Sequence, residues 1–388
     1  MRILFLDAPA FAKQDMIDAF LECGIECDLF SHKAYKERFD QDYEDAFDKK
    51  VESVEYQFVF SFNYYPILSK CCQKHNLKYV SYVYDSPLVA LYSCTILNSC
   101  NYVFIFDKVT YCTLKNEGIT TVYYLPLAAN VKRLCAISCQ REEETKLKAD
   151  ISFVGSLYNE EHNFFERLSS GISGYTKGYL EGLMAAQQKL YGCFLLEELL
   201  PPDIIADMQK AVPYSPMPDG VESSSYVYAN YFLARKVTSN ERISLLKVIS
   251  QNYNLKLYTH KPSKKLPKAH FAGSVDPYNG FPLVARNSKI NLNISLRSIQ
   301  SGIPLRCMDI MGAGGFLLTN FQADFLDYFT PGEDFVYYES EEDCISKAGY
   351  YLSHEAERKQ IVANALGRME ESHTFVHRVK EILDVVNF

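Results

Sequence analysis

The first third of the chain alternates short apolar runs with stretches in which apolar residues recur at helical spacing. The runs are almost continuously apolar, which is typical of parallel strands buried on both faces of a sheet. They lie at residues 2–7, 27–30, 57–62, 78–84, 102–106 and 121–125. Helical stretches fit between them, so the pattern predicts a doubly wound α/β domain.

The same alternation returns later in the chain. A strand at 150–154 runs into a turn of small residues, and further strands are expected at 255–259, 270–272, 290–294, 315–319 and 335–338. Residues 160–250 are helical in composition, with helices expected at 179–200 and 242–250. The stretch 339–386 is amphipathic and predicts at least two more helices.

These patterns predict two Rossmann-like α/β domains in series. Residues 125–150 pass from LPLAAN to a charged run at 141–148, which is typical of a linker. We expect an N-terminal domain at 1–130, a linker at 131–149 and a C-terminal domain at 150–372 with a helical insertion near 175–240. The length of 388 residues agrees with two domains, and 48% hydrophobic with 23% charged residues indicates a soluble globular protein.

The net charge of the chain bears on which kinds of partner it can bind. A net charge of -8 argues against nucleic acid, because affinity for a phosphate backbone rests on clustered Lys and Arg. One segment departs from this balance: residues 256–270 contain Lys261, Lys264, Lys265 and Lys268. These lysines are either a solvated loop or a patch that faces phosphate or a membrane surface.

Motifs that the sequence lacks predict its cellular location and whether it binds a metal. The N-terminus, MRILFLDAPAF, has no long apolar region before Asp7, and no apolar run reaches the length of a membrane span. We therefore expect a cytoplasmic protein without a transmembrane segment. The twelve cysteines are scattered and form no C-x-x-C pair, so we expect reduced thiols and no metal site.

Three common nucleotide or catalytic motifs are missing. The loop after the first strand, DAPA, has no glycine, whereas dinucleotide binding there needs G-x-G-x-x-G. Neither a P-loop nor a G-x-S-x-G elbow occurs. In doubly wound sheets, ligands bind beyond the carboxyl ends of the strands, so the strand-end loops are the candidate sites, and we expect them to face each other across a cleft between the domains.

The loops of the C-terminal domain offer candidates for a nucleotide. Backbone amides after its first strand are suited to a phosphate, the turn after a later strand to the edge of a base, and a cation to a diphosphate. The residues, in chain order, are Gly155, Ser156, Thr259, His260, Val275, Asp276, Tyr278 and Arg297. In the N-terminal domain, Asp85 before Ser86 and Pro87 is either a helix cap or a residue that binds an acceptor or acts as a base.

The stretch 301–319, SGIPLRCMDIMGAGGFLLT, combines more of these features than any other. We expect Ser301 as the N-cap of a helix with Pro304 in its first turn, Arg306 and Asp309 on one face, and then a buried strand. The helix start, with the amides of Gly302 and Ile303, favours phosphate, and Asp309 lies about 12 Å further along the axis, where a ribose would be. Alternatively, Arg306 and Asp309 form only a surface ion pair.

Several segments together resemble a known family. They are FVGSLYNEEHNFF at 153–165, KINLNIS at 289–295, GIPLRCMDIMGAGGFLLTNF at 302–321, DYFTPGEDFVYYES at 327–340 and HTFVHRV at 373–379. These are similar to the C-terminal module of group-1-like glycosyltransferases of the spore-maturation-protein type. SYVYDSPL at 81–88 and YYLPLAAN at 123–130 are similar to the N-terminal domain that accompanies it.

The resemblance implies a GT-B fold, which is two Rossmann-like domains around a cleft, with the sugar nucleotide on the C-terminal domain and the acceptor on the N-terminal one. It also implies that the final helix, at 373–388, packs back on the N-terminal domain and that catalysis is metal-independent. Related enzymes carry two acids eight residues apart on the helix described above. Here Asp309 has the second position, which binds the ribose, but Ser301 replaces the first, so the contact to the donor sugar differs.

The expectation is a glycosyltransferase that moves a hexosyl group from a nucleoside diphosphate sugar, such as a UDP-sugar, to a hydroxyl of a glycan, protein or surface polymer. We expect retention of configuration and no cofactor. Arg306 and Asp85 are the candidate catalytic residues. Two alternatives stay open: a GT-B epimerase or phosphorylase, and a non-catalytic scaffold with the same fold.

Overall fold

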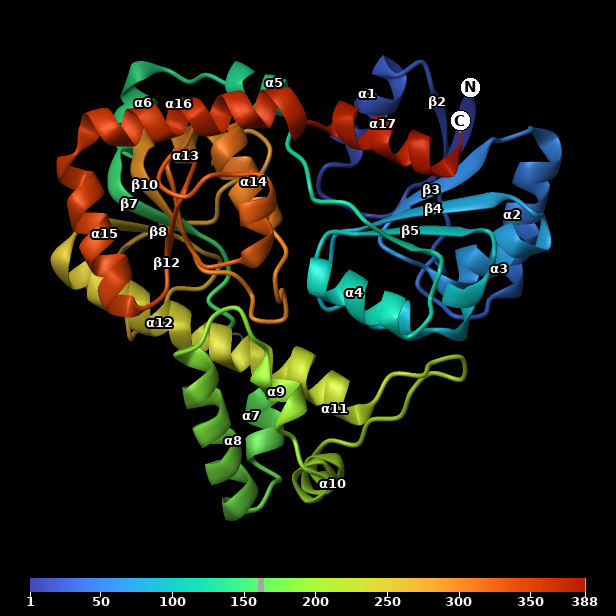
Figure 1. The fold of residues 1–388 in the computed structure, drawn as a ribbon, viewed down its shortest axis with the longest axis horizontal. Helices are drawn as coiled ribbons and strands as arrows, with labels where there is room; N and C mark the ends of the chain where they lie inside the picture. The colour runs from blue at the N-terminus through green and yellow to red at the C-terminus, as the bar shows by residue number, and fades with distance from the viewer. Residues whose placement is uncertain (160–163, 388) are drawn as a thin grey trace. The chain divides into compact units, whose positions relative to one another are not determined.

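A computed structural model describes residues 1–159 and 164–387 of the chain (Figure 1). The chain divides into two compact units. Unit 1 comprises Met1–Leu127, Ser215–Ser223 and Thr374–Phe388, and unit 2 comprises Ala128–Tyr214 and Ser224–His373.

Unit 1 is built on a parallel sheet with the strand order β2-β1-β3-β4-β5-β6. Its strands are β1 (Arg2–Leu6), β2 (Glu26–Phe30), β3 (Phe58–Phe62), β4 (Lys78–Val83), β5 (Asn101–Ile105) and β6 (Val122–Tyr124). The helices are α1 (Lys13–Glu22), α2 (Gln41–Ser53), α3 (Pro66–Lys74), α4 (Lys108–Asn116) and α17 (Phe375–Val386), with 3₁₀ turns at Val89–Tyr92 and Cys94–Leu97. α17 packs against α1. Every residue of β3 is buried, as a central strand covered on both faces requires.

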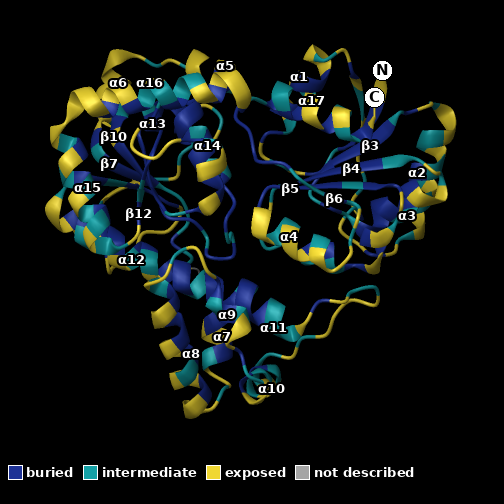
Figure 2. Ribbon diagram, viewed as in Figure 1, coloured by how far each residue is buried: buried dark blue, intermediate teal, exposed yellow. Residues whose placement is uncertain are grey.

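Unit 2 contains a second parallel sheet, in the order β12-β11-β10-β7-β8-β9. Its strands are β7 (Ala149–Val154), β8 (Leu255–Tyr258), β9 (His270–Gly273), β10 (Ser288–Asn293), β11 (Leu317–Asn320) and β12 (Val336–Tyr338). The helices around the sheet are α5 (Val131–Ala136), α6 (Arg141–Leu147), α12 (Ala234–Asn252), α13 (Phe281–Asn287), α14 (Leu305–Gly312), α15 (Glu341–Ser353) and α16 (Glu355–Ser372). Figure 2 shows the buried strands of both sheets between helices that are exposed on one side only.

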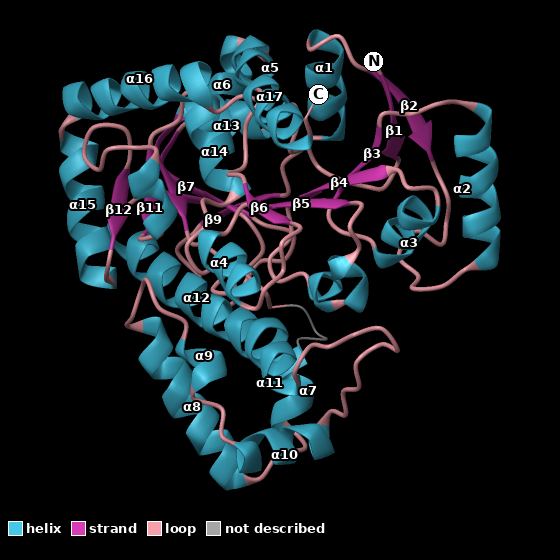
Figure 3. Ribbon diagram, turned by 45° about the vertical axis from the view of Figure 1, so that its right-hand side comes forward, coloured by secondary structure: helices cyan, strands magenta, loops and turns pink. Residues whose placement is uncertain are grey.

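A group of helices is inserted between β7 and α12, and it has an apolar core of its own. It contains α7 (Phe164–Ser169), α8 (Gly174–Gln188), α9 (Leu195–Glu198), α10 (Pro202–Ala211) and α11 (Ser224–Val227). Helix α11 continues through a π-helical turn, Tyr228–Leu233, into α12. Figure 3 shows these helices gathered around the N-terminal end of α12.

The predicted fold class is confirmed, since each expected strand has a counterpart in one of the two sheets. Three local expectations differ from the structure. The expected linker at 131–149 contains α5 and α6 and belongs to unit 2. The expected helix at 179–200 is broken between α8 and α9, where Gly192 has φ +76. Residues 215–223, which lie within the insertion expected near 175–240, belong to unit 1.

Residues 215–223, which we call the strap, pair with the 3₁₀ turns of unit 1. The amide of Val221 donates to the carbonyl of Tyr92 at 2.8 Å, and the carbonyl of Asp219 accepts from the amide of Cys94 at 2.8 Å. The Asp219 carboxylate also accepts from the Ser93 hydroxyl at 2.7 Å. The strap therefore joins unit 1 through backbone pairing as well as side chains.

None of the described helices is both long and apolar enough to cross a membrane.

Candidate functional site

The strand order of unit 2 reverses between β7 and β10, the position at which doubly wound sheets form a ligand crevice beyond the carboxyl ends of the strands. The chain runs from β7 outward through β8 and β9, then returns to the other side of β7 as β10. This is the order of the dinucleotide-binding sheets, in which ligands bind where the strand order reverses. The candidate site is therefore the set of side chains around the ends of β7 and β10.

Arg242 on α12 holds the two strand ends together. Its Nη1 donates to the Ser156 carbonyl after β7 at 2.5 Å, and its Nη2 donates to the Ile294 carbonyl after β10 at 2.5 Å. Burial lowers the pKa of Arg242, because a buried guanidinium loses its hydration. The guanidinium remains charged, and thus it adds positive potential to the crevice.

Arg306 and Asp309 lie one helical turn apart on α14. The Arg306 guanidinium stacks over the Phe281 ring, 4.1 Å from its centroid. Burial lowers the pKa of Arg306, and Asp309 opposes this, whereas Arg242 lowers it further. Arg242, Arg306 and Asp309 therefore interact electrostatically at one edge of the sheet.

Helix α14 begins later than expected. Its N-cap is Pro304, which has extended backbone dihedrals, and Ser301 stands in a turn before the helix. The Ser301 carbonyl accepts from the Asp324 amide at 3.0 Å, and the Gly302 carbonyl accepts from Gln322 Nε2 at 3.3 Å. The expectation that Ser301 caps the helix is therefore wrong, and the separation of Ser301 from Asp309 along a helix axis does not apply. Ser301, Gly302 and Ile303 still form a buried turn at the start of α14.

Glycines at the end of α14 set how closely it packs. A Cβ on Gly312 would lie 2.9 Å from Cβ of Ala129, and one on Gly315 would lie 2.8 Å from Nδ2 of Asn291 on β10. Between them, Gly314 has φ +76, the left-handed conformation that often ends a helix. These glycines let α14 lie close against the neighbouring chain, and they stand away from its N-terminal end.

Arg297 has a different environment from the one expected. Its side chain is 8% exposed and forms an ion pair with Glu241 of α12, in which Nε donates to Oε2 at 2.7 Å and Nη2 to Oε1. It also donates to the carbonyl of Leu190 at 2.8 Å and stacks over the Tyr191 ring at 4.1 Å. Burial acts to lower the pKa of Arg297, but the ion pair with Glu241 raises it overall. Because protein atoms already occupy its donors, Arg297 is held as a structural ion pair rather than presented to a diphosphate.

The residues after β7 are partly engaged as well. The Gly155 amide donates to the Tyr258 carbonyl at 3.0 Å and continues the sheet, so it is not presented to a phosphate as expected. A Cβ on Gly155 would lie 3.3 Å from the Phe153 ring and 3.6 Å from Nη1 of Arg242. Ser156 Oγ accepts from the amide of Tyr158 at 2.9 Å.

The ends of β8 and β9 form a second group. Thr259 is buried, whereas His260 is exposed and its Nδ1 lies 3.5 Å from Ser274 Oγ. Asp276 accepts from the Asn279 amide at 2.7 Å through its side chain and from the Phe281 amide through its carbonyl. Partly exposed Val275 lies against Gly280 in the same turn, and Tyr278 lies beneath the guanidinium of Arg133, 5.2 Å from the ring centroid. Asp276 thus shapes the turn that leads into α13.

In unit 1, Asp85 stands after β4 at the carboxyl edge of the other sheet. Asn63, after β3, donates from Nδ2 to Asp85 Oδ2 at 2.8 Å, and its Oδ1 accepts from the Asp85 amide at 3.0 Å. Asp85 is exposed, yet the protein around it displaces enough water to raise its pKa, while Asn63 opposes the shift. A carboxylate with a raised pKa that is held in one orientation is suited to accept a proton.

The sequence reasoning missed Arg242 and Glu241. Arg242 falls on the apolar face of α12, in the spacing that also contains Thr238, Leu246 and Ile249. A charged residue within such a stripe signals a buried ion pair or a carbonyl-binding guanidinium, so Arg242 was recognisable. Its partners were not, because they come from the ends of two strands far away in the chain.

No group of three or more metal-ligating side chains occurs among the residues that the structure describes.

Comparison with known proteins starts from the sequence. Residues 235–384 match the family described as glycosyl transferase-like, a segment that begins at α12 and contains both Arg306 and Asp309. The curated proteins contain no match to the chain.

The solved structures give matches over the whole chain. Sucrose-phosphate synthase from Thermosynechococcus elongatus has a TM-score of 0.54 at 10% identity, covering 99% of this chain and 98% of that one. A glycosyltransferase from Rickettsia africae has a TM-score of 0.53 at 10% identity, with 99% and 97% covered. HepE of Anabaena in complex with UDP-glucose has a TM-score of 0.52 at 10% identity, with 99% and 100% covered.

The chain has a GT-B fold. At 10% identity the likeness concerns the fold, in which two parallel α/β sheets occur in one chain. Within this GT-B fold, unit 2 contains nearly all of the segment that matches the glycosyl transferase-like family.

Proposed function

We propose that the protein is a glycosyltransferase that transfers a hexosyl group from a nucleoside diphosphate sugar, in particular a UDP-sugar, to an acceptor hydroxyl. The observation that carries the proposal is the position of Arg306 and Asp309 one helical turn apart on α14, within the segment that matches the glycosyl transferase-like family. The GT-B fold supports it, and so does HepE of Anabaena, which was solved with UDP-glucose in a similar fold.

The roles follow from the chemistry of the side chains. The Asp309 carboxylate accepts hydrogen bonds from ribose hydroxyls, and the Arg306 guanidinium binds the diphosphate. The turn at Ser301, Gly302 and Ile303 lies at the start of α14, where the helix dipole favours a phosphate or a sugar hydroxyl that carries negative charge. Thr259, His260 and Tyr278 lie at the ends of β8 and β9, where the base binds.

In the reaction, the bond between the anomeric carbon and the diphosphate oxygen breaks, and a bond from the acceptor oxygen to that carbon forms. Arg306 stabilises the negative charge that develops on the departing diphosphate, with Arg242 adding to the potential. Asp85 in unit 1 accepts the proton of the acceptor hydroxyl. We propose that transfer retains the anomeric configuration and that these cations take the place of a divalent ion.

The test is the affinity for UDP measured by calorimetry. Asp309→Asn should weaken binding at least tenfold, because the amide no longer offers two charged acceptors to the ribose, and Arg306→Gln should do the same at the diphosphate. Asp203→Asn, an exposed carboxylate of α10 in the same unit, is the matched control and should bind like the wild type.

Unchanged UDP affinity in Asp309→Asn would overturn the ribose assignment. Turnover is tested separately by incubation with a panel of sugar nucleotides, in which free nucleoside diphosphate should appear faster with an acceptor than without. NMR of the product's anomeric proton then reports retention or inversion, and turnover in EDTA tests metal independence.

A further inference from the structure

The lysine segment noted in the sequence lies beside a hollow in unit 2. The segment that connects β8 to β9 passes beside α12. A cavity of about 740 Å³ lies between this segment and the helix. Both walls carry positive charge: Lys236 and Lys247 come from α12, and Lys264 and Lys265 come from the crossing segment.

Among the described residues that line this cavity, lysines outnumber carboxylates. Glu166 is the only described carboxylate in its lining, and it forms an ion pair with Lys236 at 2.8 Å. Lys236 holds the pKa of Glu166 below its ordinary value, and Lys177 and Lys265 contribute. Lys247 and Lys264 form no ion pair with a described residue, so the described lining contains four lysines and one carboxylate.

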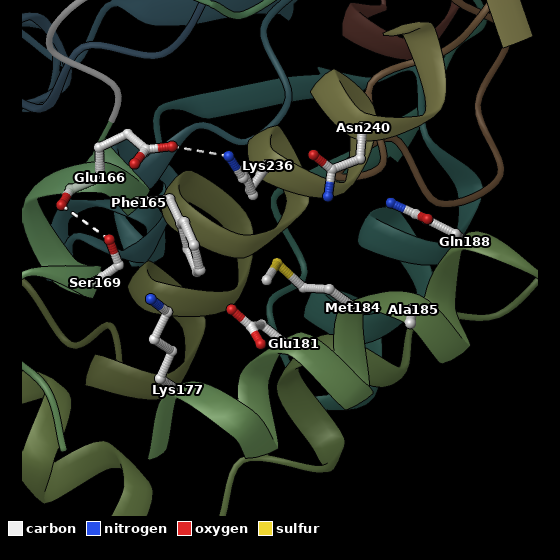
Figure 4. A pocket seen from close by; sticks show the side chains of 10 residues that line it. All are labelled: Phe165, Glu166, Ser169, Lys177, Glu181, Met184, Ala185, Gln188, Lys236 and Asn240. Carbon is white, nitrogen blue, oxygen red and sulfur yellow. Dashed lines mark hydrogen bonds and ion pairs between the residues drawn. The ribbon is translucent and has the colours of Figure 1, made fainter. Parts of the chain in front are cut away.

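A neighbouring cavity of about 340 Å³ extends the hollow toward α8 and shares Glu166, Lys236 and Asn240 with the first. Figure 4 shows this second cavity, with the ion pair between Glu166 and Lys236 on one side and Lys177 and the carboxylate of Glu181, both on α8, on the other. The two cavities together form a groove along α12, which we call the α12 groove.

The α12 groove adjoins the candidate donor site at Tyr158, which lines the groove and lies 4.8 Å, at its ring centroid, from the Arg242 guanidinium, but it extends in another direction. On α12, Lys236, Asn240 and Lys247 line the groove, whereas Arg242 lies about 200° around the helix from Asn240 and binds the strand ends. Lys236 and Lys247 are eleven residues apart, so the lysines extend about 16 Å along the helix and away from the carboxyl edge. Neither Arg306 nor Asp309 is among its lining residues.

We propose that the α12 groove is a second anion site, which binds a phosphate-bearing ligand with phosphoryl oxygens between Lys247 and the pair Lys264 and Lys265. Lysine ammonium groups bind phosphate as point charges, and a cavity with lysines on both walls surrounds a compact anion better than a flat surface does. Such a ligand is either a phosphorylated sugar or a phosphate-linked polymer. The site goes beyond the donor site and does not depend on it.

The experiment measures pyrophosphate binding by calorimetry at low ionic strength, with the full chain. Lys264→Gln/Lys265→Gln removes two charges from the groove, and Lys261→Gln/Lys268→Gln removes two from the same segment outside the lining. Both variants change the net charge from -8 to -10, because each replaces two lysines by neutral residues. The groove variant should lose at least tenfold in affinity, and the control should stay within about twofold.

The donor diphosphate site is controlled for by repeating the titrations in Arg306→Gln. The loss of pyrophosphate affinity caused by Lys264→Gln/Lys265→Gln should persist in that background. The same double variant with Arg306 intact should bind UDP like the wild type. A failure of the groove proposal can therefore be told apart from a failure of the donor-site assignment. Binding of a hexose phosphate would identify a small metabolite, and binding of polyphosphate alone would identify a polymer. Equal losses in the two double variants, or no binding of any of the three anions, would overturn the proposal.

Discussion

The two units contain the same kind of sheet but satisfy buried polar groups at their central strands in different ways. Unit 1 uses neutral hydroxyls: the fully buried Tyr79 accepts from the Tyr65 amide at 3.0 Å, and Tyr82 donates to the Pro126 carbonyl at 2.6 Å. Unit 2 uses guanidinium groups, with Arg242 on two strand-end carbonyls and Arg297 paired with Glu241. Unit 1 also contains buried guanidinium groups away from its central strands: Arg378 of α17 donates to the Pro126 carbonyl at 2.7 Å and to the Leu127 carbonyl at 3.3 Å, and Arg38 pairs with Asp219 of the strap at 3.6 Å.

This difference bears on function as well as on stability. A hydroxyl needs a single partner and leaves the sheet edge neutral, whereas a buried guanidinium needs several acceptors and remains charged. The ends of the central strands β7 and β10 in unit 2 therefore have a fixed positive potential, which suits the proposed anionic donor, whereas the buried guanidinium of Arg378 in unit 1 lies beyond the edge strand β6. Variants that exchange one kind of partner for another test this comparison.

The largest effect is expected for Glu241→Gln in unit 2. The substitution leaves the buried Arg297 guanidinium without its counter-ion, and the free energy of unfolding should fall by about 3–5 kcal/mol. The double variant Glu241→Leu/Arg297→Met removes both charges and should recover most of this loss, because well-packed apolar residues can replace a buried pair. Urea unfolding followed by circular dichroism measures both.

Glu355→Gln is the matched control for that prediction. Glu355 pairs with Lys359 at 2.6 Å on the surface of α16, where solvent screens the interaction. Its loss should leave the free energy of unfolding almost unchanged. If Glu241→Gln costs no more than Glu355→Gln, unit 2 does not depend on its buried ion pair.

A smaller effect is expected for Tyr79→Phe in unit 1. The variant removes the acceptor of the Tyr65 amide and a hydrogen bond to Ser61 Oγ at 2.7 Å, so the free energy of unfolding should fall by about 1–2 kcal/mol. Tyr102→Phe on the neighbouring strand β5 is the control, because Tyr102 is only partly buried and stacks on Tyr123 through its ring. A loss as large as that of Glu241→Gln would contradict the contrast between the units.

The sequence predicted the strands well because burial on both faces leaves a nearly continuous apolar run, as in β3 and β4. It also predicted the segment from Arg306 to Asp309 as helical, since their spacing is local. The start of that helix was mispredicted, although a signal was present: the residue before a proline is forced out of helical dihedrals, so Ile303 cannot continue a helix from Ser301.

The partners of the buried charged side chains could not be predicted from the sequence. Arg297 appeared suited to a diphosphate because it follows a strand, but its acceptors come from α12 and from the end of α8. The strap was equally hidden, since the pairing of Val221 with Tyr92 joins residues more than a hundred positions apart. Such contacts are set by tertiary packing, and the periodicity of the sequence carries no information about them.

The smallest predicted effect concerns the N-terminal cap of α17 in unit 1, where a neutral side chain completes the cap. Thr374 and His377 form a capping box, with His377 Nδ1 at 2.7 Å from Thr374 Oγ1. Burial lowers the pKa of His377, and the neighbouring Arg378 and Lys380 lower it further. The neutral imidazole is thus the form that the folded protein favours.

The sign of the pH dependence follows from that shift. Because the folded pKa lies below the ordinary value of 6.5, the cap contributes its full stability above about pH 6.5 and loses it as the pH falls through the folded pKa. His377→Gln keeps a side chain that can complete the box but does not titrate. The melting temperature of the wild type should therefore fall relative to that of His377→Gln by about 2–4 °C between pH 7 and pH 5, as expected for a cap of about 1 kcal/mol. Parallel melting curves would show that a charged His377 is tolerated at the cap and that the cap of α17 does not depend on a neutral partner.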